Sequence, residues 1–247
     1  MAGHSKWANI KHRKGAQDAR RGKIFTKLIK EISVAARTGG PDIDTNPRLR
    51  LAVQNAKGQN MPKDNIERAI KKATGTDGTD YIEITYEGYG PNGVAIFVEC
   101  MTDNLNRTVS SVRSLFSKYG GSLGTNGSVE YMFEQKGIFT ILPEDGFDED
   151  ETTLELIDGG AEEVEYEEGY LSVSCARDDF GNLQKKIEEM GLKPENSELQ
   201  RLPTTTVSLD DDGFAKVMKL IDAFEDDDDV QKIYHNIEMT DAQIGSL

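Results

Sequence analysis

Cysteine, tryptophan and long apolar runs are scarce in this sequence of 247 residues. Its two cysteines, Cys100 and Cys175, lie in apolar runs with the pattern of strands, so we expect buried, reduced thiols rather than a disulfide framework. The longest purely apolar run covers only residues 94–98, whereas a membrane span needs about 20 residues. No apolar signal segment follows Met1. These absences predict a cytoplasmic protein with no membrane partner.

Positive charge is also scarce overall, because 29 Lys and Arg face 44 Asp and Glu for a net charge of −15. The deficit is unevenly spread. Residues 1–75 contain 17 Lys and Arg and 6 Asp and Glu, a surplus of 11 positive charges, whereas residues 76–247 have a net charge of −26. This segregation indicates a contact with nucleic acid or another anionic surface, confined to the first part of the chain. The acidic remainder either repels phosphates and restricts docking or is only a solvated surface.

Recognisable catalytic and metal-binding patterns are lacking as well. Residues 88–93 match a dinucleotide-binding fingerprint by letter, but the strand-like run 94–98 follows where that motif requires a helix, so we reject it. The acidic runs within 144–151 and at 226–229 lack the spacing of a calcium loop, and we interpret them as solvated faces. None of the three histidines has a Cys or carboxylate at metal-ligand spacing, and no Ser or Cys has a triad context. We therefore predict no enzyme activity, metal, cofactor or small-molecule substrate.

Apolar side chains at three- and four-residue spacing predict three helices near the start, at about 24–36, 46–56 and 62–73. Asn46 is a favourable N-cap for the second helix, with Pro47 at its first position. The connecting loops are short, so the helices should pack side by side as a small bundle.

Strand patterns begin after residue 78 and alternate with helices to the end of the chain. We expect strands at 82–86, 94–98 and 129–133, with a helix at 105–119. Residues 137–203 then follow the order strand-helix-strand-strand-helix-strand of a ferredoxin-like unit. The tail adds elements whose expected ranges are strand 205–209, helix 214–224 and strand 230–237.

The basic N-terminal segment is the strongest candidate site. Residues 1–30 contain nine Lys or Arg and a single acid, Asp18, and such cations can neutralise phosphates and release counterions. Residues 1–20 lack a sustained apolar face and should be mobile until something binds them. Trp7 either stacks on an exposed base or docks on the helical bundle. The partner is DNA or RNA, since phosphate contacts do not discriminate between them. The predicted contact residues are Lys6, Trp7, Lys11, His12, Arg13, Lys14, Arg20, Arg21, Lys23 and Lys27.

Four separated motifs occur in order along the chain. They are residues 1–23 (MAGHSKWANIKHRK at the start), residues 60–70 (NMPKDNIERAI), residues 86–91 (YEGYGP) and residues 102–108 (TDNLNRT). Together they resemble the YebC/PmpR family over essentially the whole chain. The resemblance implies an N-terminal three-helix domain followed by two α+β domains, the third ferredoxin-like and inserted in the second. The boundaries that we expect are 1–78, then 79–136 plus 204–247, and 137–203 for the inserted domain.

The resemblance also implies a function. Family members are described as DNA-binding transcriptional regulators, and close relatives, including the mitochondrial activator of cytochrome oxidase translation, as ribosome-associated translation factors. We therefore expect a non-enzymatic regulator of gene expression with DNA as its partner. The alternative is a translation factor that binds ribosomal RNA and relieves stalling, and a second alternative is an adaptor that binds only proteins. No oligomeric state is indicated.

Overall fold

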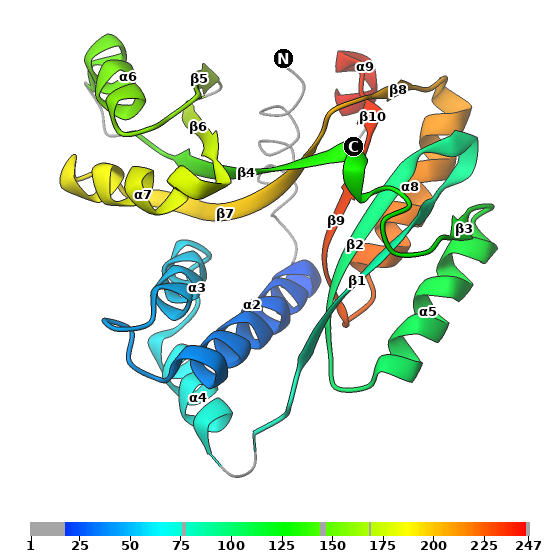
Figure 1. The fold of residues 1–247 in the computed structure, drawn as a ribbon, viewed down its shortest axis with the longest axis horizontal. Coiled ribbons are helices and arrows are strands. Elements are labelled where there is room, and N and C mark those ends of the chain that lie inside the picture. Colours follow the sequence, from blue (N-terminus) through cyan, green and yellow to red (C-terminus); the bar gives the residue numbers. More distant parts are fainter. Residues whose placement is uncertain (1–17, 76–77, 144–146, 168, 246–247) are drawn as a thin grey trace.

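The computed structural model describes residues 18–75, 78–143, 147–167 and 169–245, and shows three groups of elements (Figure 1). A group of helices lies at the lower left of Figure 1, a sheet with two helices on the right, and a second sheet with two helices at the upper left. The bounds of the helical group are α2 Asp18–Gly39, α3 Pro47–Gly58 and α4 Lys63–Thr74. This confirms the prediction of an N-terminal three-helix domain.

Asn46 fixes the corner between the first two helices. Its side-chain oxygen accepts a hydrogen bond from the backbone nitrogen of Leu49 at 3.0 Å, and its amide donates to the carbonyl oxygens of Ala35 and Gly40, both at 2.8 Å. The predicted cap and the place of Pro47 at the first helical position are both confirmed. The bundle core contains Ile32, Ala35, Leu49, Val53, Ala56, Met61, Ile66 and Ala69. Helix α2 begins before the apolar pattern does, because Ala, Arg and Lys favour helix without needing burial.

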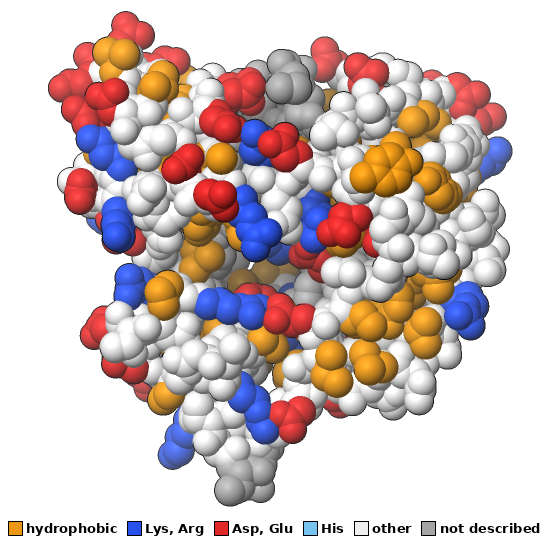
Figure 2. Space-filling view, viewed as in Figure 1, with side chains coloured by type: hydrophobic (Ala, Val, Ile, Leu, Met, Phe, Trp, Pro, Cys, Tyr) orange, Lys and Arg blue, Asp and Glu red, His pale blue; other side chains and the backbone are white. Residues whose placement is uncertain are grey.

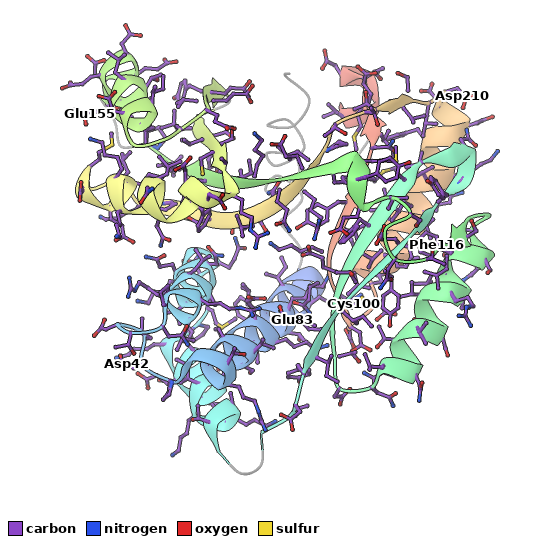
Figure 3. The ribbon with its side chains drawn as sticks, in the orientation of Figure 1. Asp42, Glu83, Cys100, Phe116, Glu155 and Asp210 are labelled. Carbon is purple, nitrogen blue, oxygen red and sulfur yellow. The ribbon has the colours of Figure 1, made fainter. Side chains whose placement is uncertain are left out.

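The first sheet is antiparallel, with the strand order β3-β1-β2-β9, and helices α5 and α8 pack on it. Phe116 of α5 points toward the sheet (Figure 3), and its ring lies edge-on to that of Phe224 of α8, with centroids 5.0 Å apart. Predicted strands at 82–86 and 94–98 and a predicted helix at 105–119 are confirmed. The bounds are β1 Ile82–Tyr89, β2 Ala95–Thr102, α5 Leu105–Lys118, β3 Ser122–Leu123, α8 Asp211–Glu225 and β9 Val230–His235.

The second sheet is also antiparallel, with the order β5-β6-β4-β7, and α6 and α7 enclose its core. Phe139 of β4 stacks on Phe180 of α7, with ring centroids 4.8 Å apart. The bounds are β4 Phe133–Ile141, α6 Glu149–Asp158, β5 Glu163–Glu167, β6 Tyr170–Ala176, α7 Phe180–Glu189 and β7 Pro194–Pro203. After β7 the chain returns to the first sheet, where β9 pairs with β2. A parallel pair, β8 Val207–Ser208 with β10 Ile237–Glu238, and helix α9 Asp241–Gly245 complete the described chain.

The prediction of a strand over 129–133 is wrong. Residues Glu130–Met132 form a 3-10 turn, and strand β4 begins only at Phe133. The reason is the buried carboxylate of Glu87, which accepts hydrogen bonds from the backbone nitrogens of Gly127, Val129 and Glu130 at 2.6, 2.8 and 2.8 Å. These bonds take the backbone donors that a ladder would have used.

The two predicted C-terminal strands are shorter than expected. Of residues 205–209 only Val207–Ser208 pair, and the strand predicted over 230–237 is divided at Asn236. The side-chain oxygen of buried Asn236 accepts a hydrogen bond from the backbone nitrogen of Ala95 at 2.8 Å, which ends the regular pairing of β9 with β2.

The helical group contacts the second sheet through α3. The side-chain amide of Asn55 donates to the carbonyl oxygen of Ser197 at 2.9 Å, and its oxygen accepts from the backbone nitrogen of Ser197 at 3.0 Å. A Cβ atom on Gly58 would lie 2.1 Å from the carbonyl oxygen of Glu195, so only glycine allows this approach. Helix α3 therefore covers the otherwise open edge of β7.

The two sheets contact each other through β7 on one side and β9 and β2 on the other. Lys232 of β9 forms an ion pair with Glu198 of β7 at 2.6 Å, and Arg201 of β7 forms one with Glu99 of β2 at 3.1 Å. The Arg201 guanidinium also lies over the ring of Phe97, 4.1 Å from its centroid. The second sheet thus contacts both the helical group and the first sheet.

Replacing Glu87 by alanine should lower the free energy of unfolding by about 3 kcal/mol, because buried backbone donors lose a charged acceptor. Urea unfolding measures the change. Glu163→Ala, at an exposed position, is the control and should stay within about 0.5 kcal/mol of the parent. An equally small effect of Glu87→Ala would contradict this account of the turn.

Candidate nucleic-acid interface

Most of the predicted contact residues lie outside the described part of the chain. This holds for Lys6, Trp7, Lys11, His12, Arg13 and Lys14. Arg20 and Arg21 belong to the first turns of α2, where only the backbone is described. Lys23 and Lys27 are the two whose side chains can be placed. The predicted site therefore stays a prediction for all ten residues.

Lys23, Lys27 and Lys30 share one face of α2, because their spacing of four and three residues corresponds to one helical turn each. That face lies against residues 225–229, which comprise the last residue of α8 and the connection to β9 and which we call the acidic segment. The Nζ of Lys23 lies 2.6 Å from a carboxylate oxygen of Asp226, and the Nζ of Lys27 donates to the carbonyl oxygen of Glu225 at 3.3 Å. Two predicted phosphate-binding residues thus contact an acidic part of the same molecule.

Lys30 is the buried member of this row. Its Nζ donates to the carbonyl oxygens of Asp228 at 2.6 Å and Met101 at 3.1 Å, and lies 3.2 Å from a carboxylate oxygen of Asp229. It also lies over the ring of Tyr81, 5.3 Å from its centroid. With three oxygen acceptors and little exposure, Lys30 ties α2 to the first sheet.

Asp229, the partner of Lys30, accepts hydrogen bonds from several further donors. Its carboxylate accepts from the guanidinium of Arg107 at 2.8 Å and from the hydroxyls of Thr108 at 2.9 Å and Thr102 at 3.2 Å, besides Lys30. Burial opposes the charged form, but the hydrogen bonds from Arg107, Thr108 and Lys30 outweigh it and hold the pKa of this carboxyl below its ordinary value. Asp229 is therefore an anion within a complete set of donors.

This arrangement corrects the interpretation of residues 226–229 as a solvated face. Asp226 and Asp228 are exposed, but Asp229 is only 6% exposed, and Asp227 accepts a hydrogen bond from the hydroxyl of Ser111. A run of four acids looks uniform in sequence, although its members have different surroundings.

A second link joins the helical group to β1. The guanidinium of Arg48 on α3 lies 2.6 Å from a carboxylate oxygen of Glu83 and 3.2 Å from one of Glu31. Figure 3 shows Glu83 on β1, next to the helical group. The hydrogen bond to Glu83 is the main cause that raises the pKa of Arg48 above its ordinary value. Arg48 is thus a structural cation.

Other cations of the helical group are open to solvent. Arg68, Lys71 and Lys72 lie on one exposed side of α4, and Lys57 is exposed at the end of α3. Within the described ranges, no hydrogen bond or ion pair of these four side chains is found. Our site prediction did not include them, although Arg68, Lys71 and Lys72 are spaced so that they lie opposite the apolar side of α4. Figure 2 shows Asp and Glu gathered along the upper edge of the molecule, whereas side chains of both signs lie over the helical group at the lower left.

The amide side chains of α3 are already engaged. Asn55 pairs with the backbone of Ser197, and Gln54 accepts a hydrogen bond from Gln184 at 3.0 Å and donates to Glu188 at 3.3 Å. Since Asn and Gln are the usual readers of adenine in a DNA groove, α3 does not present a reading surface in this arrangement. The exposed cations of α4 can hold phosphates but carry no base specificity.

Chemistry at the two thiols is disfavoured. Burial raises the pKa of Cys100 to about 12 and that of Cys175 to about 11, so both are neutral at physiological pH. No group of three or more His, Cys, Asp or Glu that could hold a metal ion occurs among the described residues. None of the described helices is long and apolar enough to cross a membrane.

Fold and surface together define a multidomain α and α+β protein with a basic helical unit joined to acidic antiparallel sheets. Two family models cover most of the chain: "TACO1/YebC protein N-terminal domain" matches residues 5–76, and "TACO1/YebC second and third domain" matches residues 81–237. The chain belongs to the TACO1/YebC family.

Individual relatives agree with this assignment. A protein of Amoebophilus asiaticus named "Probable transcriptional regulatory protein" is 56% identical over 96% of this chain and 98% of its own length. A protein of Idiomarina loihiensis with the same description is 51% identical over 100% of this chain and 99% of its own. The crystal structure of a conserved hypothetical protein from Aquifex aeolicus has a TM-score of 0.81 and 43% identity, covering 91% of this chain and 93% of that one. The names of the first two are those of regulators, not enzymes.

Asp229→Asn should lower the free energy of unfolding by about 3 to 5 kcal/mol at neutral pH, because Lys30 and Arg107 lose a buried counter-charge. Because the pKa of Asp229 is lowered in the folded state, its charge stabilises the protein above the ordinary value of 3.8, and this stabilisation is lost as the pH falls through the folded pKa. The difference in the free energy of unfolding between parent and variant should therefore be constant above about pH 5 and become smaller in acid.

Urea unfolding over a range of pH tests this expectation. Asp228→Asn is the control, since it removes an exposed neighbouring carboxylate and should change stability by less than about 0.5 kcal/mol. If the difference in the free energy of unfolding between the parent and Asp229→Asn becomes larger in acid, the carboxylate is not the stabilising form.

Proposed function

We propose that this protein is a non-enzymatic regulator of gene expression that binds nucleic acid through its N-terminal helical unit, with DNA as the first candidate. The observation that carries the proposal is the charge segregation, a surplus of 11 positive charges in residues 1–75 of a chain with net charge −15. The names of the relatives from Amoebophilus asiaticus and Idiomarina loihiensis support the transcriptional sense.

The contact surface of this proposal has two parts. The first is the predicted segment with Lys6, Trp7, Lys11, His12, Arg13, Lys14, Arg20, Arg21, Lys23 and Lys27. The second consists of the exposed cations Lys57, Arg68, Lys71 and Lys72. Both parts supply point charges for phosphates, so binding should be largely independent of sequence and fall steeply with salt.

A specific observation favours ribosomal RNA as the second candidate. Gln54 and Asn55, the amides of α3, are engaged with the second sheet, which leaves phosphate contact as the main interaction of this helix group. Phosphate and shape recognition suit a structured RNA as well as a DNA groove. A ribosome-associated translation factor, the alternative that the family resemblance implies, would use the same cations.

The domain boundaries 1–78, 79–136 plus 204–247, and 137–203 are part of the proposal, with the last unit ferredoxin-like and inserted in the second. The strand order β5-β6-β4-β7 with two helices supports the ferredoxin-like description, and the pairing of β9 with β2 supports the insertion. A cytoplasmic location belongs to the proposal too, supported by two buried, unpaired cysteines.

Replacing Arg13, Lys14, Arg20 and Arg21 by Glu should lower affinity for a short DNA duplex or an RNA hairpin by more than about tenfold at low salt, while folding is kept. Fluorescence anisotropy with each probe measures binding, and the tighter probe identifies the partner class. The control reverses Lys185, Lys193, Lys216 and Lys219, four exposed cations outside the helical unit, with the same change in net charge. Equal losses in both variants would refute a localised site.

The α4 surface has its own test. Arg68→Gln, Lys71→Gln and Lys72→Gln together should flatten the dependence of log affinity on log salt by about three units if each cation contacts a phosphate of a duplex. The matched control neutralises Lys185, Lys193 and Lys216 and should leave the slope unchanged. An unchanged slope in the α4 variant would remove this helix from the interface.

A further inference from the structure

The lysines of α2 differ in how firmly they are held by the acidic segment. Lys30 has a side chain only 8% exposed and three oxygen acceptors, so its release would leave a buried charge without partners. Lys23 has one carboxylate partner, and the side chains of Lys23 and Asp226 are 41% and 74% exposed. An ion pair in such contact with water is weak and exchanges partners readily.

The acidic segment presents a carboxylate to Lys23, from Asp226, and a backbone carbonyl oxygen to Lys27, from Glu225. Glu225, Asp226 and Asp228 are exposed, while Asp227 and Asp229 are engaged with the first sheet group through Ser111 and Arg107. The exposed acids therefore lie beside the cation row and are held there by their buried neighbours. A polyanion that approaches this face of α2 is repelled by these acids and must also displace them from the lysines.

We propose that the acidic segment is a built-in competitor of nucleic acid, which occupies Lys23 and Lys27 until phosphates displace it. This inference rests on the nucleic-acid binding proposed above. Displacement requires only rotation of the two lysine side chains, because Lys30 and Asp229 keep α2 docked. The acidic segment thereby lowers the affinity of the helical unit for nucleic acid. Only a nucleic acid whose phosphates contact several other cations at the same time then binds.

Competition of this kind changes salt dependence as well as affinity. A lysine that stays paired with a carboxylate for part of the time neutralises less phosphate, and therefore fewer counterions are released from the nucleic acid. Neutralising the exposed acids removes the carboxylate partner of Lys23, whereas the backbone carbonyl oxygen of Glu225 that accepts from Lys27 remains. The slope of log affinity against log salt should therefore steepen by about one unit, since each duplex phosphate neutralised contributes about 0.9.

The experiment compares three full-length proteins on a short DNA duplex and an RNA hairpin over a series of salt concentrations. The test variant carries Glu225→Gln, Asp226→Asn and Asp228→Asn, which leave Asp227 and Asp229 intact. The control variant carries Asp150→Asn, Asp158→Asn and Glu163→Gln, an equal change in net charge at exposed positions of α6 and β5. We expect the test variant to bind about three- to tenfold tighter than the control, with the steeper slope.

A second pair of proteins separates competition from a general field effect. In a Lys23→Gln, Lys27→Gln background, neutralising the acidic segment should no longer steepen the slope, because the contested lysines are gone. A steepening that persists there, or equal binding by test and control variants, overturns the competition while nucleic-acid binding stands. Absence of binding by every protein at low salt overturns the proposed function and this inference together.

Discussion

The arrangement of the molecule depends on one buried ion pair, that of Lys30 with Asp229. Neither group could be buried alone, since an unpaired charge in this position costs several kcal/mol. Each is completed by partners of its own: carbonyl oxygens of Met101 and Asp228 for the lysine, and Arg107 with two threonine hydroxyls for the aspartate. All of these partners are in place only when α2 lies against the end of β2. The pair therefore selects one position of the helical unit on the first sheet.

A second contact, between α3 and β7, fixes the orientation of the helical unit relative to the two sheets. Asn55 of α3 pairs with the backbone of Ser197 in β7, while Lys232 and Arg201 join β7 to the first sheet. The three groups of elements form a closed triangle of contacts, so none can rotate without breaking two interfaces. Figure 1 shows α3 beside β7 and α4 on the far side of α3. The geometry thus uses α2 and α3 for internal contacts and leaves the cations of α4 to solvent.

Sequence patterns predicted the structure correctly where it depends on residues that are close together in the chain. Apolar spacing predicted the three N-terminal helices, and the pair Asn46-Pro47 predicted the start of α3, because capping involves residues close in the chain. The wrong predictions concern residues whose structure depends on partners far away in the chain. The turn at 130–132 depends on Glu87, and the burial of Asp229 depends on Lys30, which lies 199 positions away. For the same reason the charge asymmetry could locate a basic unit, but could not distinguish Lys30, which is buried in an internal contact, from Arg68, which is exposed to solvent.

The distance over which charge acts explains how such an acidic chain can have a basic binding surface. At physiological salt the Debye length is about 8 Å, so acids on a distant helix are largely screened from a phosphate at the helical unit. What matters is the charge within that range. For α2 the near neighbours include the acids of residues 225–228, of which Asp226 lies within ion-pair distance of Lys23, whereas the exposed side of α4 carries Arg68, Lys71 and Lys72. The remote acids of α6 repel a long polyanion only where it extends past the helical unit, which restricts its orientation rather than its affinity. A single net charge therefore describes this protein poorly, and the acidic segment is the element through which the two signs interact.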